Sequence, residues 1–139
     1  MSWFFWSLLT ALTWGCVPAL EKLGLARMDP TVGLIYRCLG VVIGLVPLLV
    51  FQWSGFRATL QELPAGIAYL LAGGFLASVV GQIFFYHALK TGEVSRVVII
   101  AGAYPVISFI LGIIFLGEKM TLIKSLGVGF VLLGVILLK

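Results

Sequence analysis

Residues 29–53 read DPTVGLIYRCLGVVIGLVPLLVFQW, and this stretch decides the class of fold. Between Asp29 and Trp53 it holds a single charged side chain, Arg37. An α-helix needs about 20 consecutive apolar residues to cross the hydrocarbon core of a bilayer. Asp29 followed by Pro30 is a typical helix start, in which an N-cap residue precedes a proline in the first turn. The stretch therefore predicts a transmembrane helix over residues 30–53.

Four further apolar runs of similar length flank this one. We expect five spans, at approximately residues 3–25, 30–53, 64–89, 95–116 and 121–138. Pro64 can open the third span, and Lys139 ends the chain at a membrane interface. Residues 54–62 form a polar connection, and the other connections are very short, so neighbouring helices must pack antiparallel. The sequence predicts an all-α integral membrane protein, a five-transmembrane-helix bundle that forms one domain over residues 1–139.

The composition excludes several classes of protein. Of the 139 residues, 62% are hydrophobic and 10% are charged, whereas an ordinary soluble domain carries about 25% charged residues. A soluble globular domain, a disordered tail and a disulfide-stapled secreted module are thereby excluded. The sequence shows no basic patch for nucleic acid. It shows no nucleophile, acid pair or metal-ligand cluster at membrane depth, so we expect no enzyme, no cofactor and no metal.

Positive side chains are divided almost evenly between the two membrane faces. The face of the N-terminus carries Arg57, Lys119 and Lys124, and the other face carries Lys22, Arg27, Lys90, Arg96 and Lys139. The Lys and Arg bias that sets orientation is therefore weak. Two interpretations remain open. Either the second face is simply cytoplasmic, or the chain inserts in both orientations.

Several short motifs follow one another in a characteristic order. In the C-terminal half they are Tyr86-His87-Ala88-Leu89-Lys90, Pro105, Leu116-Gly117-Glu118-Lys119, Thr121, Gly127 and Gly134. The N-terminal half adds Trp14-Gly15, Lys22 and Arg37. This order resembles the EamA repeat of the drug/metabolite transporter superfamily, over essentially the whole chain. Typical members carry two such five-helix repeats, and this chain is similar to the single-repeat, five-span members.

The resemblance implies a secondary transporter of small organic metabolites in the prokaryotic cytoplasmic (inner) membrane. The family's two repeats are related by inversion, so a single repeat would restore that architecture by pairing with an inverted copy of itself. We therefore expect alternating access in an antiparallel homodimer, with membrane lipid and a small-molecule solute as its other partners. The small multidrug-resistance transporters pair in this way, but Leu12-Thr13-Trp14-Gly15 lacks their membrane-embedded glutamate. That absence argues against drug/proton antiport by their mechanism.

The most polar face of the first span is formed by residues at helical spacing. They are Trp3, Ser7, Thr10, Trp14, Pro18 and Glu21. One interpretation is that the hydroxyls only bond back to the helix or across to a neighbour. The other makes this face a wall of the substrate cavity, with Thr10 and Trp14 as contacts and Pro18 as a hinge.

The third and fourth spans hold further candidates. Gly74, Ser78, Gly81 and Phe85 share one face of the third span, and Gln82 and Tyr86 lie beside it. The amide of Gln82 needs hydrogen-bond partners in a membrane, so Gln82 and Tyr86 are predicted substrate contacts. In the fourth span, Pro105 frees a backbone carbonyl near the middle. It is a predicted hinge, and the adjacent Tyr104 and Ser108 are predicted substrate contacts.

Charged groups near one membrane face suggest a gate. An arginine at mid-depth costs about 2.5–3.5 kcal/mol on insertion scales, so Arg37 is expected to have a partner, for which Glu21 is the candidate. Glu21, Arg37 and His87 are predicted to form a gate or ion pair. Gly127 and Gly134, two turns apart in the fifth span, are the predicted dimer interface. The alternative function is a subunit of a hetero-oligomeric transporter or of a flippase for lipid-linked head groups.

Overall fold

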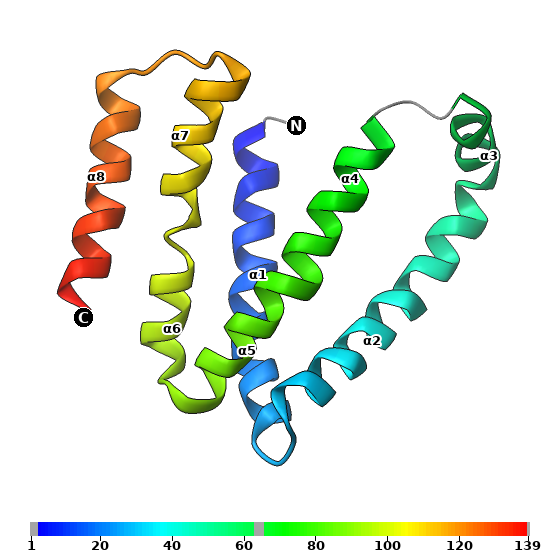
Figure 1. Cartoon of the computed structure of the whole chain (residues 1–139), viewed down its shortest axis with the longest axis horizontal. Helices are drawn as coiled ribbons and strands as arrows, with labels where there is room; N and C mark the ends of the chain where they lie inside the picture. The colour runs from blue at the N-terminus through cyan, green and yellow to red at the C-terminus, as the bar shows by residue number, and fades with distance from the viewer. Residues whose placement is uncertain (1–2, 63–65, 139) are drawn as a thin grey trace. The chain divides into compact units, whose positions relative to one another are not determined.

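The computed structural model describes residues 3–62 and 66–138 (Figure 1). Within these residues the elements are α1 (Trp3–Leu25), α2 (Pro30–Phe51), α3 (Trp53–Glu62), α4 (Gly66–Phe75), the π-helix η1 (Leu76–Gly81), α5 (Gln82–Thr91), α6 (Val94–Ala101), α7 (Tyr104–Leu116) and α8 (Leu122–Leu137). All of this regular structure is helical, which confirms the all-α prediction for the described part of the chain. Pro64 and Lys139, to which the sequence analysis assigns roles, lie outside it.

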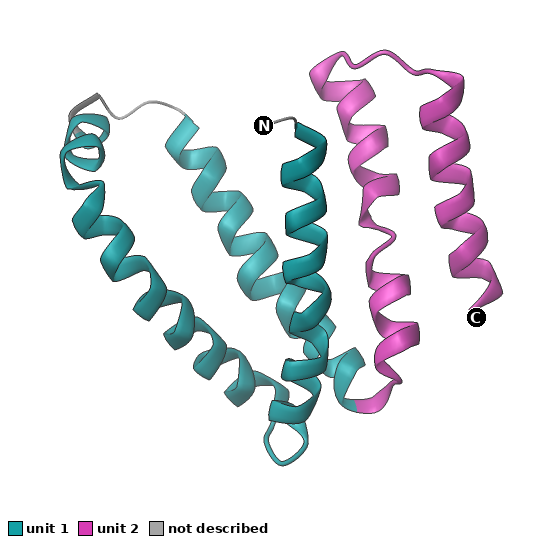
Figure 2. Cartoon of the chain, turned by 180° about the vertical axis from the view of Figure 1, so that it is seen from behind, with its two compact units in different colours: residues 1–90 teal, residues 91–139 magenta. Residues whose placement is uncertain are grey.

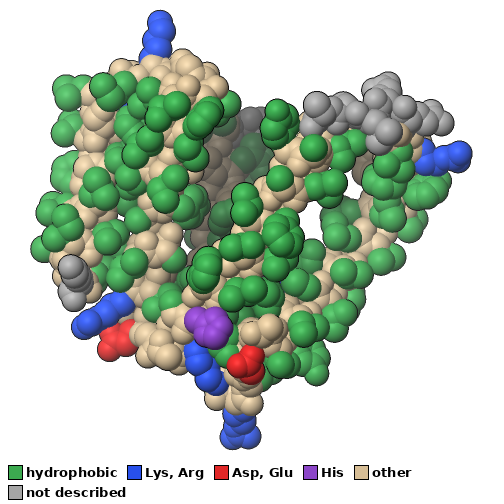
Figure 3. Space-filling view, viewed as in Figure 1, with side chains coloured by type: hydrophobic (Ala, Val, Ile, Leu, Met, Phe, Trp, Pro, Cys, Tyr) green, Lys and Arg blue, Asp and Glu red, His purple; other side chains and the backbone are tan. Residues whose placement is uncertain are grey.

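Four helical stretches are long and apolar enough to cross a membrane. They are Trp3–Leu25, Pro30–Phe51, Gly66–Thr91 and Val94–Leu116. On the face that Figure 3 shows, hydrophobic side chains cover the visible helices, and the visible charged side chains lie near helix ends. The chain is therefore an integral, multi-pass membrane protein.

The fifth predicted span corresponds to a shorter helix. We expect a span over residues 121–138, and α8 holds 16 residues, or about 24 Å at 1.5 Å per residue. The hydrocarbon core is about 30 Å thick. A helix of this length crosses where the bilayer thins or where flanking residues reach the interface.

The chain divides into two compact units, residues 1–90 and 91–139 (Figure 2). In the first unit, α2 begins where the sequence predicts. The Asp29 carboxylate accepts a hydrogen bond from the Thr31 backbone N–H at 2.8 Å, and Pro30 follows in the first turn. This is the N-cap arrangement in which an acidic side chain satisfies a free N–H group of the helix end.

The polar connection predicted after α2, over residues 54–62, is itself helical. α2 ends at Phe51, two residues before the predicted end, and α3 begins at Trp53. Trp53, Phe56 and Leu60 lie on one face of α3, where the Trp53 and Phe56 rings stack at 6.1 Å. All three are exposed. A short helix with aromatic residues on one face and a basic residue, here Arg57, beside them is typical of a helix lying in the membrane interface.

The third span changes its helical form part-way. η1 is a π-helix between α4 and α5, and one turn of π-helix adds the equivalent of one inserted residue to an α-helix. Gln82 and Tyr86 therefore take the places that Gly81 and Phe85 would hold on the face of Gly74 and Ser78. The expected shared face holds only as far as the π-helix, and Tyr86 is buried whereas Phe85 is partly exposed.

In the second unit, the fourth span is interrupted in its middle. α6 ends at Ala101, and a turn follows in which the Gly102 N–H donates to the Val98 carbonyl at 2.7 Å. α7 then begins at Tyr104 with Pro105 in its first turn. Because proline has no N–H to continue the preceding helix, the span stops and restarts here. The fourth span, predicted as one helix with a kink at Pro105, is thus formed by two helices, α6 and α7.

The turn between α7 and α8 depends on Gly117, which adopts a left-handed conformation with φ of 65°. This conformation at a helix C-terminus favours glycine. The next residue closes the cap, since the Glu118 N–H donates to the Gly112 carbonyl at 3.0 Å. The Glu118 carboxylate accepts a hydrogen bond from Lys124 at 2.9 Å. The Leu116-Gly117-Glu118-Lys119 motif is thus a helix cap, and Thr121 caps the start of α8.

Candidate functional site

One carboxylate oxygen gathers three donors inside the first unit. Glu21 lies on α1 one turn before its end, and its side chain is 10% exposed. Its Oε1 accepts hydrogen bonds from the Tyr86 hydroxyl at 2.8 Å and from Gln82 Nε2 at 3.0 Å. Arg37 Nε lies 3.2 Å from the same oxygen. Side chains of α2 and α5 therefore converge on α1. We call Glu21, Arg37, Gln82 and Tyr86 the Glu21 cluster.

A reciprocal pair of lysines holds the ends of α1 and α5 together. The Lys22 ammonium donates to the Leu89 carbonyl at 2.5 Å. The Lys90 ammonium donates to the Leu25 carbonyl at 2.5 Å and to the Met28 carbonyl at 3.0 Å. The last carbonyls of a helix lack partners within the helix and carry partial negative charge, so a cation there is favourable. Each lysine therefore caps the other helix, which keeps Glu21 level with Gln82 and Tyr86.

Gly33 lets the start of α2 approach the end of α1. Gly33 is buried, and a Cβ atom at this position would lie 2.6 Å from Leu25 Cδ2 and 3.5 Å from the Tyr86 ring. A side chain at this position would force the Leu25 side chain, which is 2% exposed, to shift. Arg37 follows one turn later on α2, so this close approach brings its guanidinium to Glu21.

A cavity of about 470 Å³ lies against the Glu21 cluster. Glu21, Arg37 and Tyr86 line it, and most of its remaining wall is apolar, including Val17, Leu20, Leu25 and Val41. Sites for small molecules are typically cavities of about 300–1,000 Å³ with apolar walls and a few placed polar groups. The cavity has these properties.

Arg37 has capacity for a further partner. Its side chain is 30% exposed, and its Nε faces Glu21. Its Nη1 atom is buried and has no hydrogen-bond acceptor among the described residues. A buried charged donor without an acceptor is costly, so this atom marks a place where an acceptor from outside the described residues would be stabilising.

Residues 1–139 match the EamA-like transporter family. The chain belongs to this family. It is a membrane transporter by family, and the resemblance of its motif order to an EamA repeat is confirmed.

Relatives of this EamA-like transporter agree with a single repeat. An uncharacterized transporter of a Sinorhizobium species is 32% identical over 137 residues, which cover 99% of this chain and 96% of that protein. An uncharacterized protein of Methanocaldococcus jannaschii is 28% identical over 131 residues, 94% of this chain and 91% of that protein. Proteins of about this length therefore occur among its relatives.

A longer relative is also present. An uncharacterized transporter of Archaeoglobus fulgidus is 33% identical over 95 residues, which cover 68% of this chain and 34% of that protein. That protein is thus about twice as long as this EamA-like chain. No solved structure matches the chain.

The upper part of the predicted α1 face does not join the Glu21 cluster. Thr10 Oγ1 donates to the Trp6 carbonyl at 2.9 Å, and Ser7 bonds back to Trp3 in the same way. These bonds are the ones expected if the hydroxyls serve the helix itself. Trp14 is 62% exposed. Pro18 is buried, and α1 runs through it without interruption.

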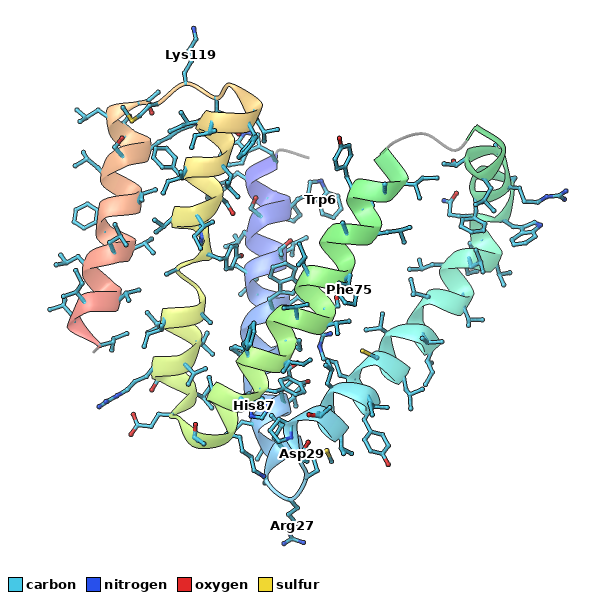
Figure 4. The ribbon with its side chains drawn as sticks, viewed as in Figure 1. Trp6, Arg27, Asp29, Phe75, His87 and Lys119 are labelled. Atoms are coloured by element: carbon cyan, nitrogen blue, oxygen red, sulfur yellow. The ribbon has the colours of Figure 1, made fainter. Side chains whose placement is uncertain are left out.

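His87 lies at the end of α5 beside the loop that joins α1 and α2. Figure 4 shows His87 and Asp29 close together, and Arg27 pointing away at the tip of this loop. His87 is exposed. The Thr31 N–H bonded to the Asp29 carboxylate lowers the pKa of that carboxyl below its ordinary value, and the charge of His87 acts in the same direction.

The remaining predicted residues of the EamA-like chain belong to the second unit. Tyr104 is 56% exposed, and Ser108 is exposed on α7. No atom lies within 4 Å of a Cβ built at Gly127 or Gly134. Within the described residues, these faces of α7 and α8 are open. The assigned substrate, hinge and interface roles stay predictions.

Two features that position the site, the lysine caps and the π-helix, were not predicted from the sequence. The sequence places Lys22 and Lys90 near one membrane face, but it does not pair each with the other helix's end. A lysine in the last turn of both α1 and α5 is the signal that could have suggested caps. The π-helix that turns Gln82 and Tyr86 towards α1 has no comparable signal in the sequence.

Proposed function

We propose that this EamA-like transporter is a secondary carrier of small organic solutes in the prokaryotic cytoplasmic membrane. It works by alternating access as an antiparallel homodimer. The observation that carries this proposal is the Glu21 cluster beside a cavity of about 470 Å³ in a chain built from membrane-spanning helices. The cavity supplies a place for a solute, and the cluster supplies a contact that can open.

The Glu21–Arg37 pair serves as the gate. Its two side chains come from different helices, α1 and α2, and they meet at 3.2 Å. Separating these helices breaks the pair, but Glu21 keeps the Tyr86 hydroxyl and the Gln82 amide, both from α5. Opening therefore does not leave the buried carboxylate without donors, which lowers its cost. A gate must open and close readily, and this arrangement meets that need.

An inverted second copy completes the carrier. Alternating access requires a gate on each side of a central site. The Glu21 cluster lies near the ends of α1 and α5, towards one membrane face, so an inverted copy would put an equivalent cluster towards the other face. The open glycine faces at Gly127 and Gly134 are the proposed contact between copies. Thr10 and Trp14 of the first unit, and Tyr104 and Ser108 of the second unit, are the proposed substrate contacts.

The test is transport by the purified chain alone. The protein is reconstituted into liposomes, and counterflow of labelled small organic solutes is measured for the wild type, Arg37→Gln and Arg27→Gln. We expect flux in the wild type, a loss of at least about tenfold in Arg37→Gln, and little change in Arg27→Gln, since Arg27 points away from the protein (Figure 4).

A topology tag on each terminus completes the experiment. Tags accessible from both membrane faces in one population support the inverted homodimer. A single fixed orientation would overturn it. Flux that appears only with a second, co-expressed protein would favour the subunit interpretation, and flux unaffected by Arg37→Gln would remove the gate.

A further inference from the structure

We propose that the cavity beside the Glu21 cluster recognises the carboxylate of an amphipathic monocarboxylate, and that Arg37 is the residue that binds it. This inference rests on the proposed function, because it names the class of solute for the same site. Its starting point is Arg37 Nη1, which is buried, lies on a residue that lines the cavity, and has no acceptor among the described residues.

The geometry of Arg37 suits a second carboxylate. A guanidinium carries five N–H donors in a planar fork, and it pairs with carboxylates through two parallel hydrogen bonds. Glu21 approaches Arg37 through Nε, on one edge of the fork. The edge that contains Nη1 is left for another oxyanion. Because Nη1 itself is buried, the partly exposed Arg37 side chain must turn to present this edge to the cavity.

Glu21 can release Arg37 without losing all its donors. Its Oε1 also accepts from Tyr86 at 2.8 Å and Gln82 at 3.0 Å. A solute carboxylate therefore competes with Glu21 for Arg37. When the solute carboxylate binds Arg37, the arginine moves away from α1. Binding of the solute and opening of the Glu21–Arg37 gate then become the same event.

The cavity wall defines the rest of the solute. Beyond the Glu21 cluster, the wall is mostly apolar, with Val17, Leu20 and Val41 among its residues. An inorganic anion would face these side chains without gaining contacts, whereas an apolar body attached to the carboxylate buries surface against them. A cationic solute gains less electrostatic stabilisation in this cavity, because the carboxylate of Glu21 already has an arginine as its counter-ion.

Three probes with one apolar body separate these possibilities. They are 3-phenylpropanoate, 3-phenylpropylamine and 3-phenylpropan-1-ol, and their binding to the purified full chain in lipid nanodiscs is measured by calorimetry. We expect the carboxylate to bind at least about tenfold more tightly than the alcohol, which corresponds to about 1.4 kcal/mol. The amine should bind no better than the alcohol. Equal binding of the three probes, or preference for the amine, would overturn the proposal.

Three variants test the role of Arg37. Arg37→Lys keeps the charge and loses the fork, so it should weaken binding of 3-phenylpropanoate about tenfold and leave the alcohol unchanged. Glu21→Gln removes the competing carboxylate and should strengthen binding of 3-phenylpropanoate several-fold. Arg27→Gln is the matched control and should behave as the wild type. Equal effects of Arg37→Lys and Arg27→Gln, or weaker carboxylate binding in Glu21→Gln, would contradict the proposal. If Arg37→Lys does not fold, the probes and Glu21→Gln decide.

The inference and the proposed function fail in different ways. Selective binding of 3-phenylpropanoate without counterflow in liposomes would leave this inference standing and remove the carrier function. Counterflow by the purified chain without preference for the carboxylate probe would support the carrier function and remove this inference. Both measurements start from the same purified protein, which is placed in nanodiscs for binding and in liposomes for counterflow.

Discussion

Glu21 holds three donors on one oxygen in a helix that is long and apolar enough to cross a membrane. Its side chain is 10% exposed and that of Arg37 is 30% exposed. A charge in such a place is stable only with a partner and further hydrogen bonds. At the scale of single residues, the four members of the Glu21 cluster therefore depend on one another, and removing one member affects the others.

A double-mutant cycle measures this dependence. Glu21→Gln leaves the Arg37 charge unpaired and should destabilise the chain by about 2 kcal/mol, less than the roughly 3–5 kcal/mol of a fully buried pair because Arg37 is partly exposed. Arg37→Gln should cost less, since Glu21 keeps Tyr86 and Gln82. Combining both substitutions should cost less than their sum. The measurement is the free energy of unfolding in mixed micelles, and additive effects would show that the pair is not coupled.

Asp29 should make the start of α2 sensitive to acid. Hydrogen bonding to the Thr31 N–H lowers the pKa of Asp29 below its ordinary value of 3.8. A carboxyl with a lowered pKa stabilises the fold fully above the unfolded value, and this contribution is lost as the pH falls through the folded value. The wild type should therefore lose thermal stability as the pH falls below about 4.

Asp29→Asn is the control for this acid effect. Asparagine caps helices about as well as aspartate but does not titrate. Its melting temperature should lack the Asp29 component of the acid loss, while Asp29→Ala should be less stable than both at neutral pH. Identical pH profiles of the wild type and Asp29→Asn would show that the cap charge has no effect.

At the scale of elements, close approach of helices and the caps on their ends position the site. α2 approaches the end of α1 at Gly33, and Lys22 and Lys90 cap the ends of α5 and α1. η1 then turns the following residues of the third span. The close approach at Gly33, the lysine caps and η1 contribute no polar group to the cavity. Each of them nevertheless determines where a member of the Glu21 cluster lies.

Two glycines of α2 give a matched comparison. A Cβ at Gly33 would lie 2.6 Å from Leu25 Cδ2, whereas no atom lies within 4 Å of one at Gly40. Gly33→Ala should destabilise the chain by about 1–3 kcal/mol through overpacking, and it should weaken the Glu21–Arg37 contact. Gly40→Ala should be neutral or slightly stabilising, because alanine favours a helix. Thermal unfolding in micelles checks both, and equal melting temperatures would contradict the close approach.

At the scale of the whole molecule, the predicted division of basic residues between the two membrane faces can be tested. Exposed basic residues can be removed from one face without disturbing the Glu21 cluster or the lysine caps. Arg57 and Lys119 serve for one face, and Arg27 and Arg96 for the other. Arg96 pairs with Glu93, but both are exposed, so the loss of that pair costs little.

Two variants with opposite charge bias test the inverted pair. Arg57→Gln with Lys119→Gln leaves one basic side chain against five, whereas Arg27→Gln, Arg96→Gln and Lys139→Gln combined with Ser54→Lys and Met120→Lys give five against two. Each variant should insert in one orientation, because the Lys and Arg bias sets topology. Each variant alone should lose most of the solute flux, and co-expression of the two should restore it. Tags on the termini report orientation, and counterflow reports function. Full flux by either oriented variant alone would exclude a functional requirement for inversion.

Local sequence patterns predict the helical membrane fold because they depend only on composition and neighbouring residues. The apolar runs locate the spans, and Asp29-Pro30 locates the start of α2. Arg37 signals its need for a partner because a lone charge is costly at membrane depth. Glu21, Gln82 and Tyr86 are each recognisable as polar groups in apolar surroundings. Each of these residues can therefore be predicted from the sequence as a candidate site residue.

The convergence of these residues depends on contacts between distant parts of the chain. Gln82 and Tyr86 lie 61 and 65 positions from Glu21, and the π-helix changes the face on which both stand. Lys22 and Lys90 cap each other's helices, which only the neighbouring position of α1 and α5 allows. The local sequence predicts which residues are buried and where helices end. Packing between helices determines which face of each helix points inward and which side chains become partners. That is why the Glu21 cluster and its unpaired Arg37 Nη1 become visible only in the folded chain.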